Sequence, residues 1–186
     1  MNRTIGAPRI AAVLLAASAL SGCSLFGGKV DMSMSKAMKQ KCPPVGIVAY
    51  TGQVTRFNGS GEEASDMTVR AELDNLKVTC TNNADNTAVS AHITFDLSGE
   101  RGPASNDSGV TLQYFVALTA DSKSVLEKKL YDSTVSFGEN GEGVTHEALD
   151  ATVPIKGDEL PYEEILIGLQ LDRHELGYNI ARAASR

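Results

Sequence analysis

The stretch VSAHITFDL, residues 89–97, decides the fold expected for this chain. Its apolar and polar residues alternate at every position: Val89, Ala91, Ile93, Phe95 and Leu97 against Ser90, His92, Thr94 and Asp96. A period of two places successive side chains on opposite faces of an extended strand. The stretch therefore predicts a strand with one face in a hydrophobic core and the other in water.

Similar segments lie on both sides of this stretch. The alternation recurs in residues 67–73 and 110–118, and further apolar segments span 45–57, 124–137, 147–155 and 163–172. Turn-rich stretches such as NGSGEE and GENGEG separate them. About seven strands with few helical patterns predict an all-β fold, an antiparallel β-sandwich of the immunoglobulin or fibronectin kind. A small β-barrel is the alternative.

Two places depart from this regular pattern. After Leu73 the apolar phase slips by one residue at Asp74-Asn75 and resumes at Leu76. Such a slip predicts a bulge or a tight turn, because otherwise the following side chains would change faces. Near the end of the chain, residues 173–186 fit either a short helix or an extended edge strand.

The first residues have the pattern of a secretory signal. Arg3 and Arg9 precede an uncharged apolar run over residues 10–20, and no acidic residue lies nearby. A membrane-spanning helix needs about twenty apolar residues, so this run is too short for one. A basic start and a short apolar run ending in small residues predict a signal peptide.

The end of that run, Leu20-Ser21-Gly22-Cys23, resembles the lipobox of bacterial lipoproteins. The resemblance implies cleavage before Cys23, a diacylglyceryl thioether on its sulfur and acylation of the new amino group. Two or three acyl chains anchor a protein without a transmembrane helix. In this class, Ser24 in place of an aspartate favours the outer membrane. We therefore expect a lipid-anchored protein of the bacterial cell envelope, at the outer membrane and facing the periplasm.

The cysteines and the composition complete the expected organisation. Residues 1–22 are interpreted as the signal peptide, 23–41 as the acylated cysteine and a flexible tether, and 42–186 as a single β-sandwich domain. With Cys23 lipidated in an oxidising compartment, Cys42 and Cys80 are expected to form a disulfide, with two free thiols as the alternative. It would close a loop of about 39 residues, a contribution of roughly 4 kcal/mol. Met32, Met34 and Met38 are interpreted as linker residues rather than soft-metal ligands.

Charge and motifs bear on the class of function. Removing residues 1–22 leaves 15 basic and 23 acidic residues, a net charge of −8, which argues against nucleic acid as a partner. The chain has no nucleophile elbow, no H-E-x-x-H or C-x-x-C spacing and no phosphate loop. His92, His146 and His174 are scattered along the chain. His92 is interpreted as a solvated residue on the polar face of its strand, and neither His146-Glu147 nor His174-Glu175 is interpreted as a catalytic dyad. The Asn82–Asn86 run is interpreted as a turn rather than a calcium loop. No catalytic residue, metal or cofactor is expected.

Together these features predict a non-enzymatic envelope lipoprotein whose sandwich serves protein–protein interaction or envelope structure. Its expected partners are the membrane, through the lipid on Cys23, and an envelope protein. A periplasmic binding module for a small or lipidic ligand is the alternative, and a hydrolase with a dispersed site is a third hypothesis. The glycine-rich loop at residues 99–109 is either a contact site or a plain connection.

Overall fold

The computed structural model describes residues 42–120, 124–155 and 163–185. The predicted signal peptide, the lipidation site Cys23 and the predicted tether with its three methionines lie outside the described residues.

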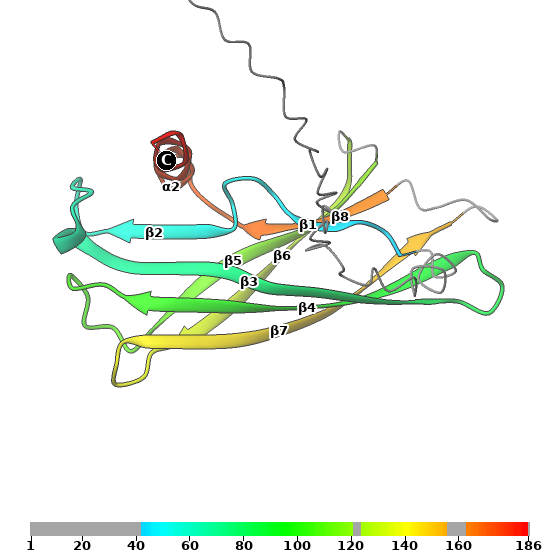
Figure 1. Ribbon diagram of the computed structural model, residues 1–186, viewed down its shortest axis with the longest axis horizontal. Helices are drawn as coiled ribbons and strands as arrows, with labels where there is room; N and C mark the ends of the chain where they lie inside the picture. Colours follow the sequence, from blue (N-terminus) through cyan, green and yellow to red (C-terminus); the bar gives the residue numbers. More distant parts are fainter. Residues whose placement is uncertain (1–41, 121–123, 156–162, 186) are drawn as a thin grey trace, which may run out of the picture. The chain divides into compact units, whose positions relative to one another are not determined.

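The described residues form two four-stranded sheets (Figure 1). One, here called the β5 sheet, has the order β1 (Val45–Ile47), β8 (Glu163–Leu169), β5 (Gly109–Ala120) and β6 (Ser124–Ser136). The other, the β4 sheet, has the order β2 (Gln53–Phe57), β3 (Met67–Asn82), β4 (Ala88–Arg101) and β7 (Glu142–Pro154). Neighbouring strands are antiparallel, except that β1 runs parallel to β8.

The predicted all-β sandwich is confirmed. Each sheet is open, with β1 and β6 at the edges of one and β2 and β7 at the edges of the other, so the barrel alternative is wrong. The two packed sheets are mostly antiparallel, as in a β-sandwich. The strand order has its own feature: β2, β3 and β4 are neighbours in space and consecutive in the chain.

The core forms where the alternation of residues 89–97 predicts it. The apolar side chains of this stretch, on β4, are fully buried, while Ser90 and His92 on the opposite face are exposed. Across the sandwich they meet buried residues of the β5 sheet, which include Leu112, Val135, Ile165, Ile167 and Leu169. Each fully buried large aliphatic side chain contributes about 1.5–3 kcal/mol to folding.

The phase slip after Leu73 is a bulge. The β3–β4 register shifts between Asp74 and Lys77, and Asn75 has a φ of 51°. Asparagine is one of the few non-glycine residues that adopts this left-handed conformation readily. The bulge lets Leu73 and Cys80 both face the core despite the odd spacing between them.

For two segments, the structure gives a more detailed answer than the sequence predicts. Residues 45–57, expected to form one strand, make two strands in different sheets, because the chain turns at Tyr50, whose φ is 65°. Between the two alternatives for the end of the chain, the helix is right: α2 spans Arg173–Ala184. Asp172 and Glu175 form a capping box at its start. No helix in the described part of the chain is long and apolar enough to cross a membrane.

Cys42 and Cys80 lie at disulfide-bonding distance, with their Cα atoms 5.5 Å apart. Cys42 lies three residues before the start of β1 and Cys80 is a buried residue of β3, so the link joins the two sheets near one end of the sandwich. The disulfide therefore joins covalently two sheets that are otherwise held together by side-chain packing.

Removing this link is expected to destabilise the sandwich. Cys42→Ser should lower the free energy of unfolding by about 4 kcal/mol, because the unfolded chain regains the entropy of an open loop. Urea unfolding of the oxidised chain, the reduced chain and the variant measures this. A reductant should shift the wild-type midpoint and leave that of the variant unchanged, and an equal shift of both would contradict the prediction.

Candidate functional site

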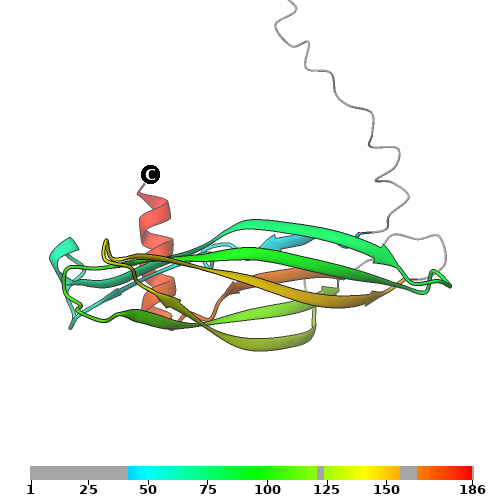
Figure 2. The same ribbon diagram turned by 90° about the horizontal axis from the view of Figure 1, so that it is seen from below.

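The edge strands β6 and β7 lie together at one end and separate towards the other. Near their connecting turn, Thr145 Oγ1 donates a hydrogen bond to the Thr134 carbonyl oxygen at 2.8 Å. Further along, residues 124–132 of β6 are all exposed, while Ser133 and Val135 are buried. In Figure 2, β6 bows away from β7 along its middle. The sandwich is therefore closed at one end of this edge and open at the other.

Charged residues on the inner side of β6 explain the opening. Glu127 lies opposite Leu118 in the strand register and Lys129 lies opposite Val116, at positions that would otherwise complete the core. Burying these charges between two sheets is costly, so they remain in contact with water. Lys129 Nζ pairs with Glu127 Oε1 at 3.0 Å.

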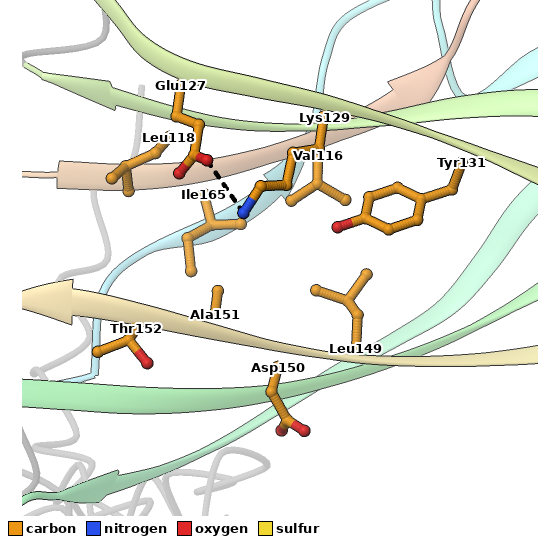
Figure 3. Close-up of a pocket in the computed structure, with 10 residues that line it drawn as sticks. All are labelled: Val116, Leu118, Glu127, Lys129, Tyr131, Leu149, Asp150, Ala151, Thr152 and Ile165. Carbon is orange, nitrogen blue, oxygen red and sulfur yellow. Dashed lines mark ion pairs between the residues drawn. The ribbon is translucent and has the colours of Figure 1, made fainter.

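The separation leaves a cleft of about 300 Å³ between the two sheets. Its walls are apolar: Val116, Leu118 and Ile165 lie on one side, and Leu149 and Ala151 of β7 on the other (Figure 3). Its rim is polar and carries Glu127, Lys129, Tyr131, Asp150 and Thr152. A cleft with apolar inner walls and a largely polar exposed surface suits an amphipathic side chain or ligand.

A partly buried carboxylate lies further along the same interior. Glu147 accepts hydrogen bonds from Ser133 Oγ at 2.5 Å and from Tyr114 Oη at 3.1 Å. The Tyr114 ring stacks on Tyr131, with centroids 5.3 Å apart, and meets the edge of Phe95. Burial, followed by the adjacent Glu147 carboxylate, raises the pKa of the Tyr114 hydroxyl well above its usual value. At neutral pH, Tyr114 therefore serves as a hydrogen-bond donor.

All three histidines are exposed, as predicted for His92, and each has a carboxylate partner. His92 Nδ1 lies 2.8 Å from Asp150 Oδ1, and His146 Nδ1 lies 2.5 Å from Asp96 Oδ1. His174 Nε2 lies 3.2 Å from Glu62 Oε1. Only the β4–β7 register, which sets His92 opposite Asp150 and Asp96 opposite His146, brings the first two pairs together. Sequence spacing carries no such signal.

The structure separates His146 from Glu147, as neighbours on a strand require. His146 reaches Asp96 on the solvent face, whereas Glu147 reaches Tyr114 inside the sandwich. A hydrogen bond from Asn75, followed by that from His146, holds the pKa of the Asp96 carboxyl below its usual value. Among the described residues, no group of three or more His, Cys, Asp or Glu side chains is placed to hold a metal ion.

The two loops considered from the sequence are hydrogen-bonded. In the loop at residues 99–109, the backbone N–H groups of Gly102 and Ala104 donate to the carbonyl oxygens of Thr68 and Met67. Asn83 Oδ1 accepts from the backbone N–H groups of Thr87 and Ala88, which is the turn-forming role expected for the Asn82–Asn86 run. The use of residues 99–109 as a contact site stays a prediction.

Exposed apolar residues gather on β6, a feature that sequence reasoning missed. Val125, Leu126, Leu130 and Tyr131 are 62%, 55%, 50% and 37% exposed, and they are four of the nine large exposed hydrophobics of the described residues. The sequence does carry a signal for this exposure. The adjacent lysines Lys128 and Lys129 place a charge on both faces of the strand, so neither face is apolar enough to be covered there.

No protein-family model matches this chain, and a search of curated proteins finds no similar sequence. The assignment of a function therefore depends on the β6 edge, the cleft beside it and the Glu147 network.

The raised pKa of Tyr114 gives stability a defined pH dependence. Unfolded tyrosine titrates near pH 10, so the contribution of Tyr114 is complete below about pH 10 and is lost as the pH rises further. Tyr114→Phe should lower the free energy of unfolding by about 1–2 kcal/mol at pH 7, because Glu147 loses a donor. The difference in the free energy of unfolding between the variant and the wild type should become smaller above about pH 10.

Urea unfolding of the wild type and of Tyr114→Phe between about pH 7 and pH 11, on either side of the tyrosine titration, measures this difference in the free energy of unfolding. Tyr131→Phe is the matched control, because Tyr131 stacks on the same ring and lies at the rim of the cleft. If both variants show the same pH dependence as the wild type, the assigned role of Tyr114 is wrong.

Proposed function

We propose that this chain is a non-enzymatic lipoprotein of the bacterial envelope, whose β-sandwich binds a protein partner through the open part of β6. The acyl chains on Cys23 hold it at the outer membrane, facing the periplasm. The observation that carries the proposal is the exposure of every residue from 124 to 132 in a strand at the edge of its sheet.

An edge strand has the chemistry of a contact site. In the described part of the chain β6 pairs only with β5, so alternate backbone N–H and C=O groups point away from the sheet. An extended segment of a partner adds to such an edge by main-chain hydrogen bonds, and pockets beside the edge select its side chains. The inter-sheet cleft supplies such a pocket directly inside β6.

The residues of this strand also suit selective contact rather than uncontrolled aggregation. Val125, Leu126 and Leu130 offer apolar area, and Lys128 and Lys129 place charge in the middle of the strand. Lysines on an edge strand oppose pairing with arbitrary strands. A partner strand must therefore present matching charges as well as apolar side chains.

A photo-reactive residue at Leu130 tests this use of β6 in growing bacteria. It should yield a discrete protein adduct on irradiation, because Leu130 is half exposed on the open edge. Val144, 55% exposed on β7, is a control of matched type and exposure. Mass spectrometry of the adduct identifies the protein. Equal, diffuse labelling from both positions would contradict the proposal.

The lipid anchor is tested separately at Cys23. Cys23→Ser removes the thiol that the lipid needs, so the chain should remain uncleaved and lose lipid labelling from a fatty-acid probe. Cys42→Ser is the control, since it leaves the lipobox intact. Normal processing and labelling of the Cys23 variant would overturn the anchor.

Ligand binding is the second candidate, and the cleft favours it. Its volume of about 300 Å³ lies at the lower end of the range of small-molecule pockets, and apolar inner walls meet a polar rim. Native mass spectrometry of the chain isolated from its own envelope distinguishes the two functions. A retained small molecule supports the ligand, and a mass without one counts against it.

A further inference from the structure

We infer that β6 pairs with β6 of a second copy of this chain, antiparallel and centred on Lys128. This inference rests on the proposed use of β6 as the contact strand and names its partner. Such pairing joins two β5 sheets edge to edge into one continuous sheet across both copies.

The order of residues along the open strand is self-complementary. Residues 125–131 read VLEKKLY, with two apolar residues, an acid, a central lysine, a basic residue and two apolar residues. In antiparallel pairing about Lys128, Leu126 lies opposite Leu130 of the second copy, and Glu127 lies opposite Lys129. By symmetry each pair occurs twice. Apolar pairs and opposite-charge pairs each stabilise an antiparallel strand pair.

Leu126 is free to take part in this pairing. In the β5–β6 register, Val125 lies opposite Thr119 and Glu127 lies opposite Leu118, so no residue of β5 lies opposite Leu126. Its side chain is 55% exposed. A leucine from a second copy would cover apolar area that this bulge leaves in water.

The contacts of Lys128 remove the main objection to this register. On the axis, two Lys128 residues meet, and like charges directly opposite one another are destabilising. In this structure, Lys128 Nζ donates to Gln170 Oε1 at 2.8 Å and lies 4.4 Å from the centre of the Phe115 ring. Phe115 lies on the neighbouring strand β5 and Gln170 directly follows β8, so the ammonium is held over the face of its own sheet and away from the open edge.

The ion pair at the rim extends across the axis. Glu127 and Lys129 already pair at 3.0 Å within one copy, on the side of the strand that faces the cleft. Two copies would place four alternating charges side by side. This arrangement matches acid to base at both positions, which an arbitrary strand would not do.

Single cysteines in the full chain, expressed in intact bacteria, test the register. Cα atoms of directly opposed residues lie about 4.5–5.5 Å apart, a separation that a disulfide spans. Lys128→Cys should therefore give a disulfide-linked dimer on a non-reducing gel. Asp132→Cys is the control on the same exposed strand, because its two copies would lie roughly 26 Å apart. We expect a dimer yield at least about tenfold higher at 128.

Off-axis variants test the direction of pairing. Leu126→Cys and Leu130→Cys should each crosslink poorly alone and efficiently when two differently tagged chains carrying one each are co-expressed. Glu127→Lys and Lys129→Glu should each weaken association, since they set like charges opposite one another. Co-expression of these two variants should restore it. Unfolding midpoints close to the wild-type value establish that each variant is folded.

The outcomes separate this inference from the proposed function. Equal yields at positions 128 and 132 overturn the second-copy pairing. If the photo-reactive residue at Leu130 then captures a different protein, the proposed function stands and only the partner is wrong. If it captures nothing, both are wrong. A dimer at 128 with rescue by the paired charge variants supports both.

Discussion

The burial of one face of β4 is the constraint on which the rest of this structure depends. Its five apolar residues, from Val89 to Leu97, lie between the two sheets and are almost entirely removed from water. Because side chains alternate, a slip of one residue would expose all of them, so the register of β4 is strongly specified. That register in turn fixes β3 and β7, which pair with β4 on its two sides.

The fixed register decides which polar residues of β7 face inwards. It sends His146 to the solvent face and Glu147 to the interior, where Tyr114 and Ser133 satisfy the carboxylate. The inward carboxylate of Glu147 is satisfied by donors from the β5 sheet, so the sheets can stay together there. The inward charges of Glu127 and Lys129 pair with each other and are exposed. The sandwich is therefore closed beside Glu147 and open beside Glu127. The inward charges thus account for the cleft beside β6, while the strand order places β6 at the edge of its sheet.

The parts of the fold that follow from local pattern could be predicted from the sequence. The strand at residues 89–97 and the bulge after Leu73 each leave a mark in the order of residues. The partner of Cys42 could be predicted from the sequence, whereas the partner of His92 could not. Cysteine number alone pointed to Cys80, while no feature of the sequence points from His92 to Asp150, which depends on strand register. The division of residues 45–57 between two sheets depends on a positive φ at Tyr50, a conformation that tyrosine adopts rarely.

The candidate site shows why sequence and structure had to be combined. In the sequence, the lysines of VLEKKLY merely interrupt a strand pattern, and the symmetry of the segment has no meaning without a place in a sheet. The structure places the segment at an edge, leaves Leu126 without an opposite residue and holds the Lys128 ammonium against Phe115 and Gln170. Natural edge strands avoid mutual pairing by carrying charge. In the inferred pairing, Glu127 and Lys129 of one copy meet their opposites in the second copy, while each Lys128 ammonium is held against its own Phe115 and Gln170.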